Sequence, residues 1–214
     1  MRTESWITEW GKGFDDKRRC TRCVYDEDTP NITFDEHGVC NYCHQWDELD
    51  RQYPTGEQGW AHMEQLAARI NEESRGRKYN VVVGVSGGCD SSYTLYLTKK
   101  LGLRPLAVHY DNTWNSDVAT LNIRNVLDAL DTDLYTYVVD NEEVDDIYRS
   151  FFRAGAKELD GITDIALAEV HLRAALKHGI KYIFEGHSFR TEGVAPLGWM
   201  YMDGKYIQDL QSKY

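Results

Sequence analysis

The sequence has no run of about 18 apolar residues, so no segment of it matches a membrane-spanning helix. Its start, Met1-Arg-Thr-Glu-Ser-Trp6, contains an acid and lacks the apolar stretch of a secretion signal, which predicts a cytoplasmic protein. Positive charge is scarce, because 24 Lys and Arg residues face 35 Asp and Glu residues and leave a net charge of −11. Such a surface repels polyanions, and we expect no nucleic-acid partner.

What is present is ordinary for a folded chain of 214 residues, with 42% hydrophobic and 28% charged residues. This composition excludes collagen, a coiled coil or extended disorder as a description of the whole chain. Five cysteines are the unusual feature. In a reducing compartment, paired cysteines are more often metal ligands or catalytic groups than disulfides.

The chain divides into three predicted sections. Residues 1–54 form a lead-in without clear periodicity, over residues 1–19, followed by a cysteine-rich segment. Residues 55–78 form a linking amphipathic helix, whose apolar residues recur at helical spacing. These residues are Trp60, Met63, Leu66, Ala67 and Ile70. Residues 79–214 form the third and largest section.

In the third section, short apolar runs alternate with helical segments. The predicted strands are 81–85, 106–108, 134–139 and 181–184, and the predicted helices are 90–101, 116–130, 141–152 and 163–178. This alternation predicts an α/β fold with a doubly wound, Rossmann-like parallel sheet. In such a fold, ligands bind outside the carboxyl ends of the strands.

Four cysteines form two C-x2-C pairs, Cys20 with Cys23 and Cys40 with Cys43, separated by sixteen residues. This spacing predicts a closed, structural Zn²⁺ site of four thiolates, which would stabilise a segment with little core by about 10 kcal/mol or more. A disulfide framework and a redox or iron–sulfur role are the alternatives. The string Cys40-Asn-Tyr-Cys43-His44 also matches a haem attachment site, which leaves the first pair unexplained.

A glycine-containing loop follows the first predicted strand and precedes a helix, with the sequence Ser86-Gly-Gly-Cys-Asp-Ser-Ser92. Two adjacent glycines let backbone N–H groups approach an anion, and the helix N-terminus adds positive charge. The serines offer hydroxyls to phosphate oxygens, whereas Asp90 can hold Mg²⁺ or cap the helix. A tight turn without a ligand is the alternative. The loop matches neither the P-loop nor the dinucleotide fingerprint.

The string S-G-G-x-D-S in this position is similar to the signature of the PP-loop ATP pyrophosphatases. Together with the cysteine spacing, the chain resembles the N-acetyl sugar amidotransferase family from about residue 20 to its end. The segments Thr33–Cys40, Glu185–Ser188 and Thr191–Gly193 also carry this resemblance. Family members convert an acetamido group of a nucleotide-sugar or nonulosonic-acid precursor to an acetamidino group, in the biosynthesis of bacterial surface polysaccharide such as the lipopolysaccharide O-antigen.

The resemblance implies ATP, Mg²⁺ and structural Zn²⁺ as cofactors. The amide oxygen attacks the α-phosphate of ATP, pyrophosphate leaves, and ammonia then displaces AMP. Ser86 and Asp90 are the implied catalytic residues. The implied ATP-binding residues are Ser86, Gly87, Gly88, Asp90, Ser91, His109, Asp111, Gly186 and His187. Arg190 is either a further anion ligand or a solvated side chain.

Cys89 lies in a turn that resembles a nucleophile elbow, but Ser91 stands where that motif requires glycine. It is either a nucleophile or a variable loop position. No glutaminase is recognisable, so the resemblance implies ammonia from separate glutaminase and cyclase-like channel subunits. Family members run longer than this chain, which predicts truncation at the C-terminal end. The alternative functions are a tRNA sulfur transferase of the PP-loop class and a catalytically incomplete, zinc-dependent scaffold.

Overall fold

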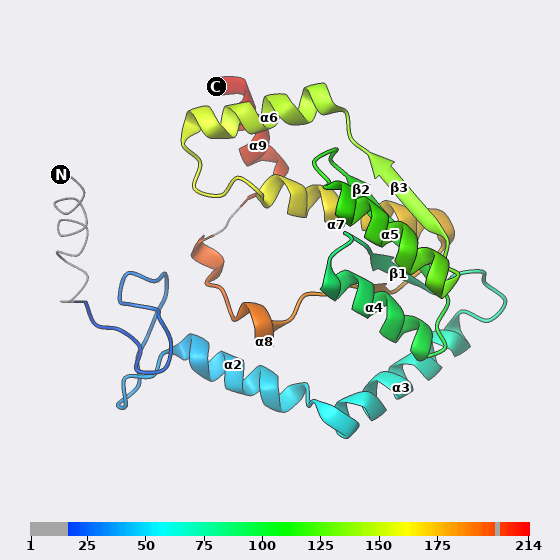
Figure 1. Cartoon of the computed structure of the whole chain (residues 1–214). Helices are drawn as coiled ribbons and strands as arrows, with labels where there is room; N and C mark the ends of the chain where they lie inside the picture. Colours follow the sequence, from blue (N-terminus) through cyan, green and yellow to red (C-terminus); the bar gives the residue numbers. More distant parts are fainter. Residues whose placement is uncertain (1–16, 200–201) are drawn as a thin grey trace. The chain divides into compact units, whose positions relative to one another are not determined.

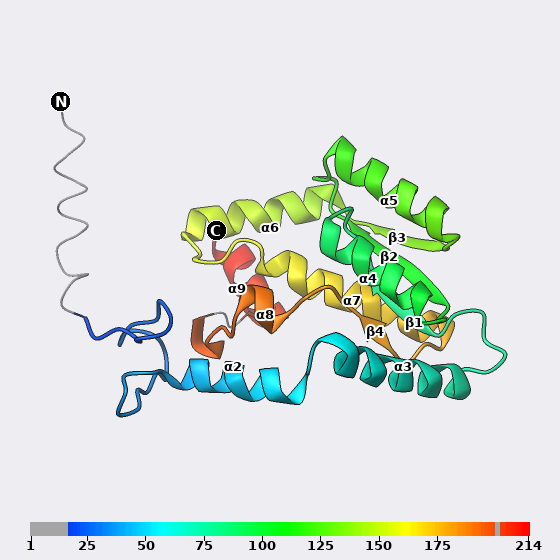
Figure 2. The same ribbon diagram turned by 60° about the horizontal axis from the view of Figure 1, so that its bottom comes forward.

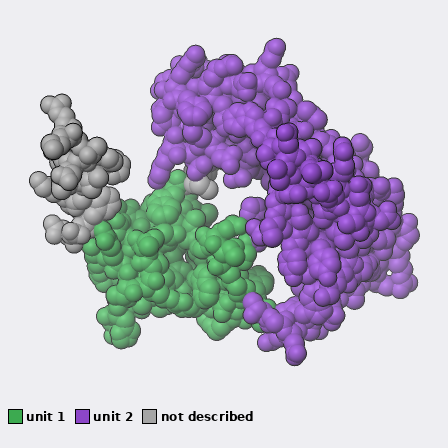
Figure 3. All heavy atoms as spheres, viewed as in Figure 1, with its two compact units in different colours: residues 1–54, 188–201 green, residues 55–187, 202–214 purple. Residues whose placement is uncertain are grey.

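The computed structural model describes residues 17–199 and 202–214, so most of the predicted lead-in over residues 1–19 lies outside the described residues. Contacts divide the chain into two compact units (Figure 3). The cysteine unit comprises Met1–Pro54 and Ser188–Tyr201. The sheet unit comprises Thr55–His187 and Met202–Tyr214. None of the described helices is long and apolar enough to cross a membrane.

The sheet unit contains four parallel strands in the order β3-β2-β1-β4. Their bounds are β1 Val81–Gly84, β2 Pro105–Asp111, β3 Leu134–Val138 and β4 Ile183–Phe184. Strand β1 is central, because Val82 pairs with both Leu106 of β2 and Ile183 of β4. The chain therefore moves to one side of β1 through β2 and β3, and to its other side at β4. The carboxyl ends of β1 and β4 flank the point where the strand order reverses.

Helices cover both faces of this sheet (Figures 1 and 2). Val81 and Val83 face a core shared with α3 (Gly56–Glu73), α4 (Cys89–Lys100) and α5 (Asp117–Leu130). Val82 points the opposite way, toward α7 (Gly161–His178). A strand buried on both faces needs a continuous apolar run, because successive side chains alternate between the faces. The predicted doubly wound α/β fold is confirmed.

A third apolar cluster joins the remaining helices of the sheet unit, α6 (Asn141–Ala154) and α9 (Gly204–Lys213), to the start of α7. Phe151 of α6 is fully buried at its centre, beside Ile162 and Leu210. Asp140 caps α6 by accepting hydrogen bonds from two backbone N–H groups of its first turn.

The cysteine unit consists of turns that carry the two cysteine pairs, helix α2 (Asn41–Gln52), and the later segment with α8 (Phe189–Glu192) and the 3-10 helix η1 (Leu197–Trp199). Its apolar cluster is small and centres on cysteines. Helix α2 was not predicted from the sequence. Cys43 is its buried residue.

The predicted strands 81–85 and 134–139 each end one residue too late, and the bounds of the other two strands differ more. Strand β2 is longer than 106–108, because His109, Tyr110 and Asp111 continue to pair with β3. Strand β4 is shorter than 181–184, because its pairing with β1 covers Ile183 and Phe184. The longer β2 brings His109 and Asp111 to the carboxyl edge of the sheet.

Candidate functional site

The loop between β1 and α4 is shaped by a glycine that no other residue can replace without strain. Gly87 has φ +77°, and a Cβ added there would lie 2.2 Å from the carbonyl oxygen of Ala119. Asn122 of α5 donates a hydrogen bond to the Gly87 carbonyl oxygen at 3.0 Å. The loop is therefore pressed against α5, a contact that requires both positive φ and the absence of a side chain.

Serine hydroxyls hold the loop against the first turn of α4. The backbone N–H of Ser86 donates to Ser91 Oγ at 3.1 Å, and the two serine oxygens are also 3.1 Å apart. Ser92 Oγ donates to the Gly88 carbonyl oxygen at 2.8 Å. Ser86 and Ser91 thus contact each other directly, and the hydroxyls of all three serines hold the loop in place.

Gly88 is the N-cap of α4 and has no side chain to cap this helix, and its own N–H donates to Ser86 Oγ at 3.4 Å. The first N–H groups of a helix have no partner inside the helix, and they carry partial positive charge. Asp90 is exposed in the first turn. An uncapped helix N-terminus behind a glycine loop is chemically suited to bind an anion.

His109 lies buried at the end of β2, fixed at both ring nitrogens. Its Nδ1 is 2.8 Å from the Val85 carbonyl oxygen, and its Nε2 is 3.1 Å from Asn115 Nδ2. Asn115 also donates to Asp111 Oδ1 at 3.1 Å. A carbonyl oxygen accepts and an amide nitrogen donates, so the ring is the neutral tautomer with its proton on Nδ1. Asn115 thereby connects His109 with Asp111.

The end of β4 reaches the same edge of the sheet. A Cβ on Gly186 would lie 3.2 Å from the carbonyl carbon of Asp90, so β4 and the first turn of α4 are in close contact there. His187 is exposed, with its Nε2 3.8 Å from Glu185 Oε2. The structure thus gathers the predicted loop residues, Gly186 and His187 at the carboxyl ends of β1 and β4, with His109 and Asp111 at the end of neighbouring β2.

Acidic groups gather around Asp164, and Glu185 after β4 is one of them. Burial raises the pKa of Asp164, at the start of α7, and the negative charges of Asp160, Glu158 and Glu185 add to this effect. His187 partly offsets the rise. Single carboxylates on different elements carry no sequence pattern, and this group was not predicted.

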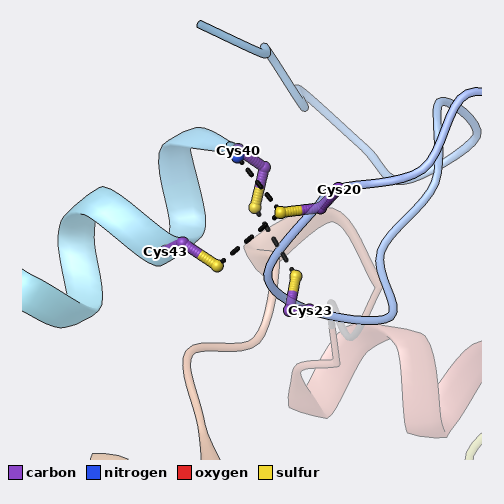
Figure 4. Close-up of side chains that lie close together, drawn as sticks. All are labelled: Cys20, Cys23, Cys40 and Cys43. Atoms are coloured by element: carbon purple, nitrogen blue, oxygen red, sulfur yellow. Dashed lines mark hydrogen bonds between the residues drawn. The ribbon is translucent and has the colours of Figure 1, made fainter. Parts of the chain in front are cut away.

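In the cysteine unit, the sulfur atoms of all four paired cysteines point toward one another (Figure 4). The Sγ atoms lie within 4.8 Å of one another, with 3.8 Å between Cys20 and Cys43 and 3.7 Å between Cys23 and Cys40. These cysteines are not disulfide-bonded. Four thiolates in a tetrahedron around one ion at about 2.3 Å would have sulfurs about 3.8 Å apart. The cluster fits a single metal ion.

Backbone N–H groups stabilise the thiolate form of one cysteine in the cluster. Burial raises the pKa of Cys20, but hydrogen bonds from the N–H groups of Arg22, Cys40 and Cys23 outweigh it and bring the pKa to about 6. Burial raises the pKa of Cys43, which has no comparable donors. In the preceding turn, the Asp35 carboxylate accepts bonds from the N–H groups of His37 and Val39 and lies 2.8 Å from His44 Nε2.

Two other residues singled out in the sequence are also located. Cys89 is exposed at the start of α4 and belongs to the sheet unit, whereas the four paired cysteines belong to the cysteine unit. Arg190 is neither solvated nor an open anion ligand. Its guanidinium bonds Asp50 and the Tyr53 carbonyl oxygen within the cysteine unit.

No protein-family model and no curated protein sequence matches the chain. Solved structures with a similar arrangement include an NH3-dependent NAD synthetase from Campylobacter jejuni, at 13% identity and TM-score 0.44, covering 70% of each chain. A glutamine-dependent NAD+ synthetase from Acinetobacter baumannii has 15% identity and TM-score 0.48, covering 73% of this chain and 33% of its own. A U34-tRNA thiolase from Methanococcus maripaludis has 13% identity and TM-score 0.44, covering 80% of this chain and 55% of its own. Identities this low transfer no function.

Proposed function

We propose that this chain is a PP-loop ATP pyrophosphatase, which cleaves ATP to AMP and pyrophosphate. The observation that carries the proposal is the position of the loop Ser86–Ser92. It joins the central strand to an uncapped helix N-terminus, at the point where the strand order reverses between β1 and β4. A glycine loop with this geometry binds phosphate through backbone N–H groups, at the edge where α/β sheets take their ligands.

In this proposal the loop grips the pyrophosphate end of ATP. Ser86, Gly87, Gly88, Asp90 and Ser91 form the grip. The bond network among the serines holds their oxygens in place before the ligand arrives, which lowers the ordering cost of binding. Mg²⁺ held at Asp90 would neutralise charge on the departing pyrophosphate.

The base and ribose of ATP are assigned to the carboxyl ends of β2 and β4. The fixed pair His109 and Asp111 supplies polar atoms at the end of β2, with Asn115 bonded to both. Gly186 allows the close approach of β4 to α4, and His187 is exposed beside it. These assignments apply the resemblance to the PP-loop enzymes at residues that lie at one edge of the sheet.

The finer proposal is that the second substrate is an acetamido sugar, a nucleotide-sugar or nonulosonic-acid precursor of bacterial surface polysaccharide. Its amide oxygen forms a bond to the α-phosphate as the α–β anhydride bond breaks, and the amide becomes an O-adenylated imidate. Ammonia then adds to the imidate carbon, and the carbon–oxygen bond to AMP breaks. The product is the acetamidino group. Positioning and charge neutralisation are the tasks of the protein.

Ammonia is proposed to come from separate glutaminase and cyclase-like subunits in the cytoplasm. Cys89 is exposed, but its turn lacks the closing glycine of a nucleophile elbow. A Cys89→Ala variant is therefore expected to keep ammonia-dependent turnover.

The four-cysteine cluster is proposed to hold structural Zn²⁺. Four thiolates fill its tetrahedral shell and leave no position for a substrate, which distinguishes it from a catalytic zinc site. The sulfur spacing near 3.8 Å supports one ion. In a [4Fe–4S] cluster each thiolate would bind a different iron, so the sulfurs would lie farther apart.

The experiment is an incubation with ATP, Mg²⁺, ammonium and an acetamido nucleotide-sugar, followed by quantification of AMP and pyrophosphate. We expect both products in equal amounts, with an Asp90→Asn variant as the inactive control. No AMP above background, under conditions where the chain is folded and metal-loaded, would contradict the enzyme and favour the scaffold alternative. Tight tRNA binding at physiological salt would favour the sulfur transferase, although the net charge of −11 opposes it.

A further inference from the structure

A histidine is buried beneath the end of the central strand at a cost to stability. His171 of α7 is 1% exposed. Its Nε2 is the buried side-chain nitrogen or oxygen that has no hydrogen-bond partner in the described part of the chain. A buried polar atom without a partner costs about 1–3 kcal/mol, so an apolar side chain of similar size would stabilise the fold better at this position.

The central strand makes room for this ring. A Cβ on Gly84 would lie 2.6 Å from His171 Cε1 and 2.8 Å from Nε2, closer than side-chain atoms pack. Gly84 is the last residue of β1, and glycine in a strand is itself unfavourable, because it brings no side chain to pack and loses much conformational freedom. Two unfavourable features therefore meet at one point, and neither is explained by the stability of the core.

The other ring nitrogen holds a carboxylate. His171 Nδ1 lies 3.0 Å from Glu185 Oε1, and the Glu185 side chain is 40% exposed, whereas that of His171 is 2% exposed. The second carboxylate oxygen lies 3.8 Å from His187 Nε2. Asp164 of α7 is close enough for the Glu185 charge to raise its pKa, together with Asp160 and Glu158. His171 and His187 are the charged or titratable groups near the Glu185 carboxylate, and Asp164 is an acid on which its charge acts.

The held carboxylate lies beside the predicted phosphate loop. Val83 of β1 pairs with Phe184 of β4, so Glu185 follows β4 next to Gly84 of β1. The next residue, Gly186, touches the backbone of Asp90 in the first turn of α4. Glu185 is thus at the carboxyl ends of the two strands that flank the reversal of strand order, which is where an α/β sheet binds its ligand.

We infer that Glu185 is the proton acceptor for the attacking nitrogen, and that His171 is a positioning residue that orients it. This inference rests on the proposed amidotransferase function. When the nitrogen comes from ammonium in solution, it is mostly protonated at neutral pH and cannot attack until it loses a proton. Glu185 takes that proton. The freed lone pair forms the carbon–nitrogen bond to the adenylated imidate, and the carbon–oxygen bond to AMP breaks.

His171 gives this carboxylate one orientation. The Nδ1–H of His171 donates to Oε1 from inside the core and leaves Oε2 at the exposed end. A buried, packed donor holds a catalytic group more closely than a flexible surface side chain does. Placing the imidazole in this buried position leaves its Nε2 without a partner and requires a glycine at position 84.

The first test compares two nucleophiles in a Glu185→Gln variant, with ammonium at neutral pH or with hydroxylamine, which is uncharged there. Loss of a general base lowers the rate by about 10²–10⁴-fold. We expect that loss with ammonium, near wild-type turnover with hydroxylamine, and unchanged exchange of pyrophosphate into ATP. The matched control is Glu169→Gln, which removes a charge from α7 at an exposed ion pair with Arg173.

The second test separates positioning from packing. His171→Leu places an apolar side chain of similar volume there and removes the unpartnered nitrogen, so its melting temperature should be equal to or higher than that of the wild type. Its turnover with ammonium should nevertheless fall at least tenfold, with the KM for ATP unchanged and with rescue by hydroxylamine. His171→Asn, which can still donate to Glu185, should recover part of the loss. A more stable His171→Leu variant with full ammonium turnover would overturn the role of His171.

The remaining outcomes are also decisive. If Glu185→Gln loses pyrophosphate exchange and hydroxylamine does not rescue it, Glu185 acts in the adenylation step, and the inference is wrong. If the wild type turns over and Glu185→Gln is unchanged, the inference fails and the proposed function stands. If the wild type forms no AMP with ammonium or hydroxylamine, the proposed function fails, and this inference fails with it.

Discussion

Arg190 and Asp50 are 140 residues apart in the sequence, yet the guanidinium donates two hydrogen bonds to one carboxylate oxygen of Asp50, at 2.9 Å from Nε and 2.6 Å from Nη2. A third bond reaches the Tyr53 carbonyl oxygen. Nearby, Trp46 Nε1 donates to the Phe189 carbonyl oxygen at 3.2 Å, and Tyr25 donates to that of Val194 at 2.8 Å. The segment that follows β4 is therefore fixed to the cysteine unit.

An Arg190→Ala variant should loosen this segment. The Asp50 side chain is 45% exposed, so solvent weakens the pair, and we expect a loss of about 1 kcal/mol in the free energy of unfolding. Amide exchange should rise in residues 188–199 and remain unchanged in β1 and β2. Arg190→Lys keeps the charge but not the two-nitrogen geometry, so its stability and amide exchange should lie between those of the wild type and Arg190→Ala. Unchanged exchange in 188–199 would show that the aromatic contacts hold the segment alone.

Metal content should depend on the paired cysteines. Purified protein is expected to contain one Zn²⁺ per chain by elemental analysis, and Cys20→Ser should abolish it. Cys89→Ser is the matched control and should keep one ion, because Cys89 is not among the four clustered thiols. Metal removal should change Trp46 fluorescence, since this residue contacts Phe189 within the cysteine unit. A metal-free Cys89→Ser variant or a metal-loaded Cys20→Ser variant would contradict the assignment.

The sheet could be predicted from sequence because its strands carry a local pattern. Val81, Val82 and Val83 form a run that is buried on both faces, and the helices α5 and α6 have a clear hydrophobic period. The cysteine cluster was predictable for a similar reason, because two short spacings bring four sulfurs together.

The contacts that were not predictable depend on single residues far apart in the chain. Asn115 and Asn122 each place one amide group on a loop or helix, and a lone asparagine carries no signal. The contact between Gly84 and His171 depends on how α7 crosses β1. The aromatic contacts of the segment after β4 follow no sequence spacing.

The two glycines of the phosphate loop should respond differently to alanine. At Gly87 a methyl group meets the Ala119 backbone at 2.2 Å in a left-handed conformation, and at Gly88 it meets Ser86 Oγ at 3.4 Å with negative φ. The backbone strain alone costs about 1–3 kcal/mol. Gly87→Ala should lower the melting temperature and weaken ATP binding, measured by calorimetry. Gly88→Ala should fold like the wild type, and equal effects of the two substitutions would contradict the loop geometry.

Asp164 makes the stability of the sheet unit depend on pH. Burial and neighbouring acids raise its pKa above the usual 3.8, so the folded state binds the proton more tightly than the unfolded state. The ionised form therefore opposes folding, by an amount that is absent below about pH 3 and grows as pH rises through the raised pKa. Asp164→Asn should raise the melting temperature at pH 7 and change it little at pH 3.

Asp133 provides the control of opposite sign. Hydrogen bonds from Lys78 and Tyr79 lower its pKa, so its ionised form favours folding, and that contribution is lost as pH falls through the lowered pKa. Asp133→Asn should therefore lower the melting temperature at pH 7, whereas Asp164→Asn raises it. If Asp164→Asn also lowers the melting temperature at pH 7, burial and the neighbouring acids do not make the ionised Asp164 unfavourable in the folded state.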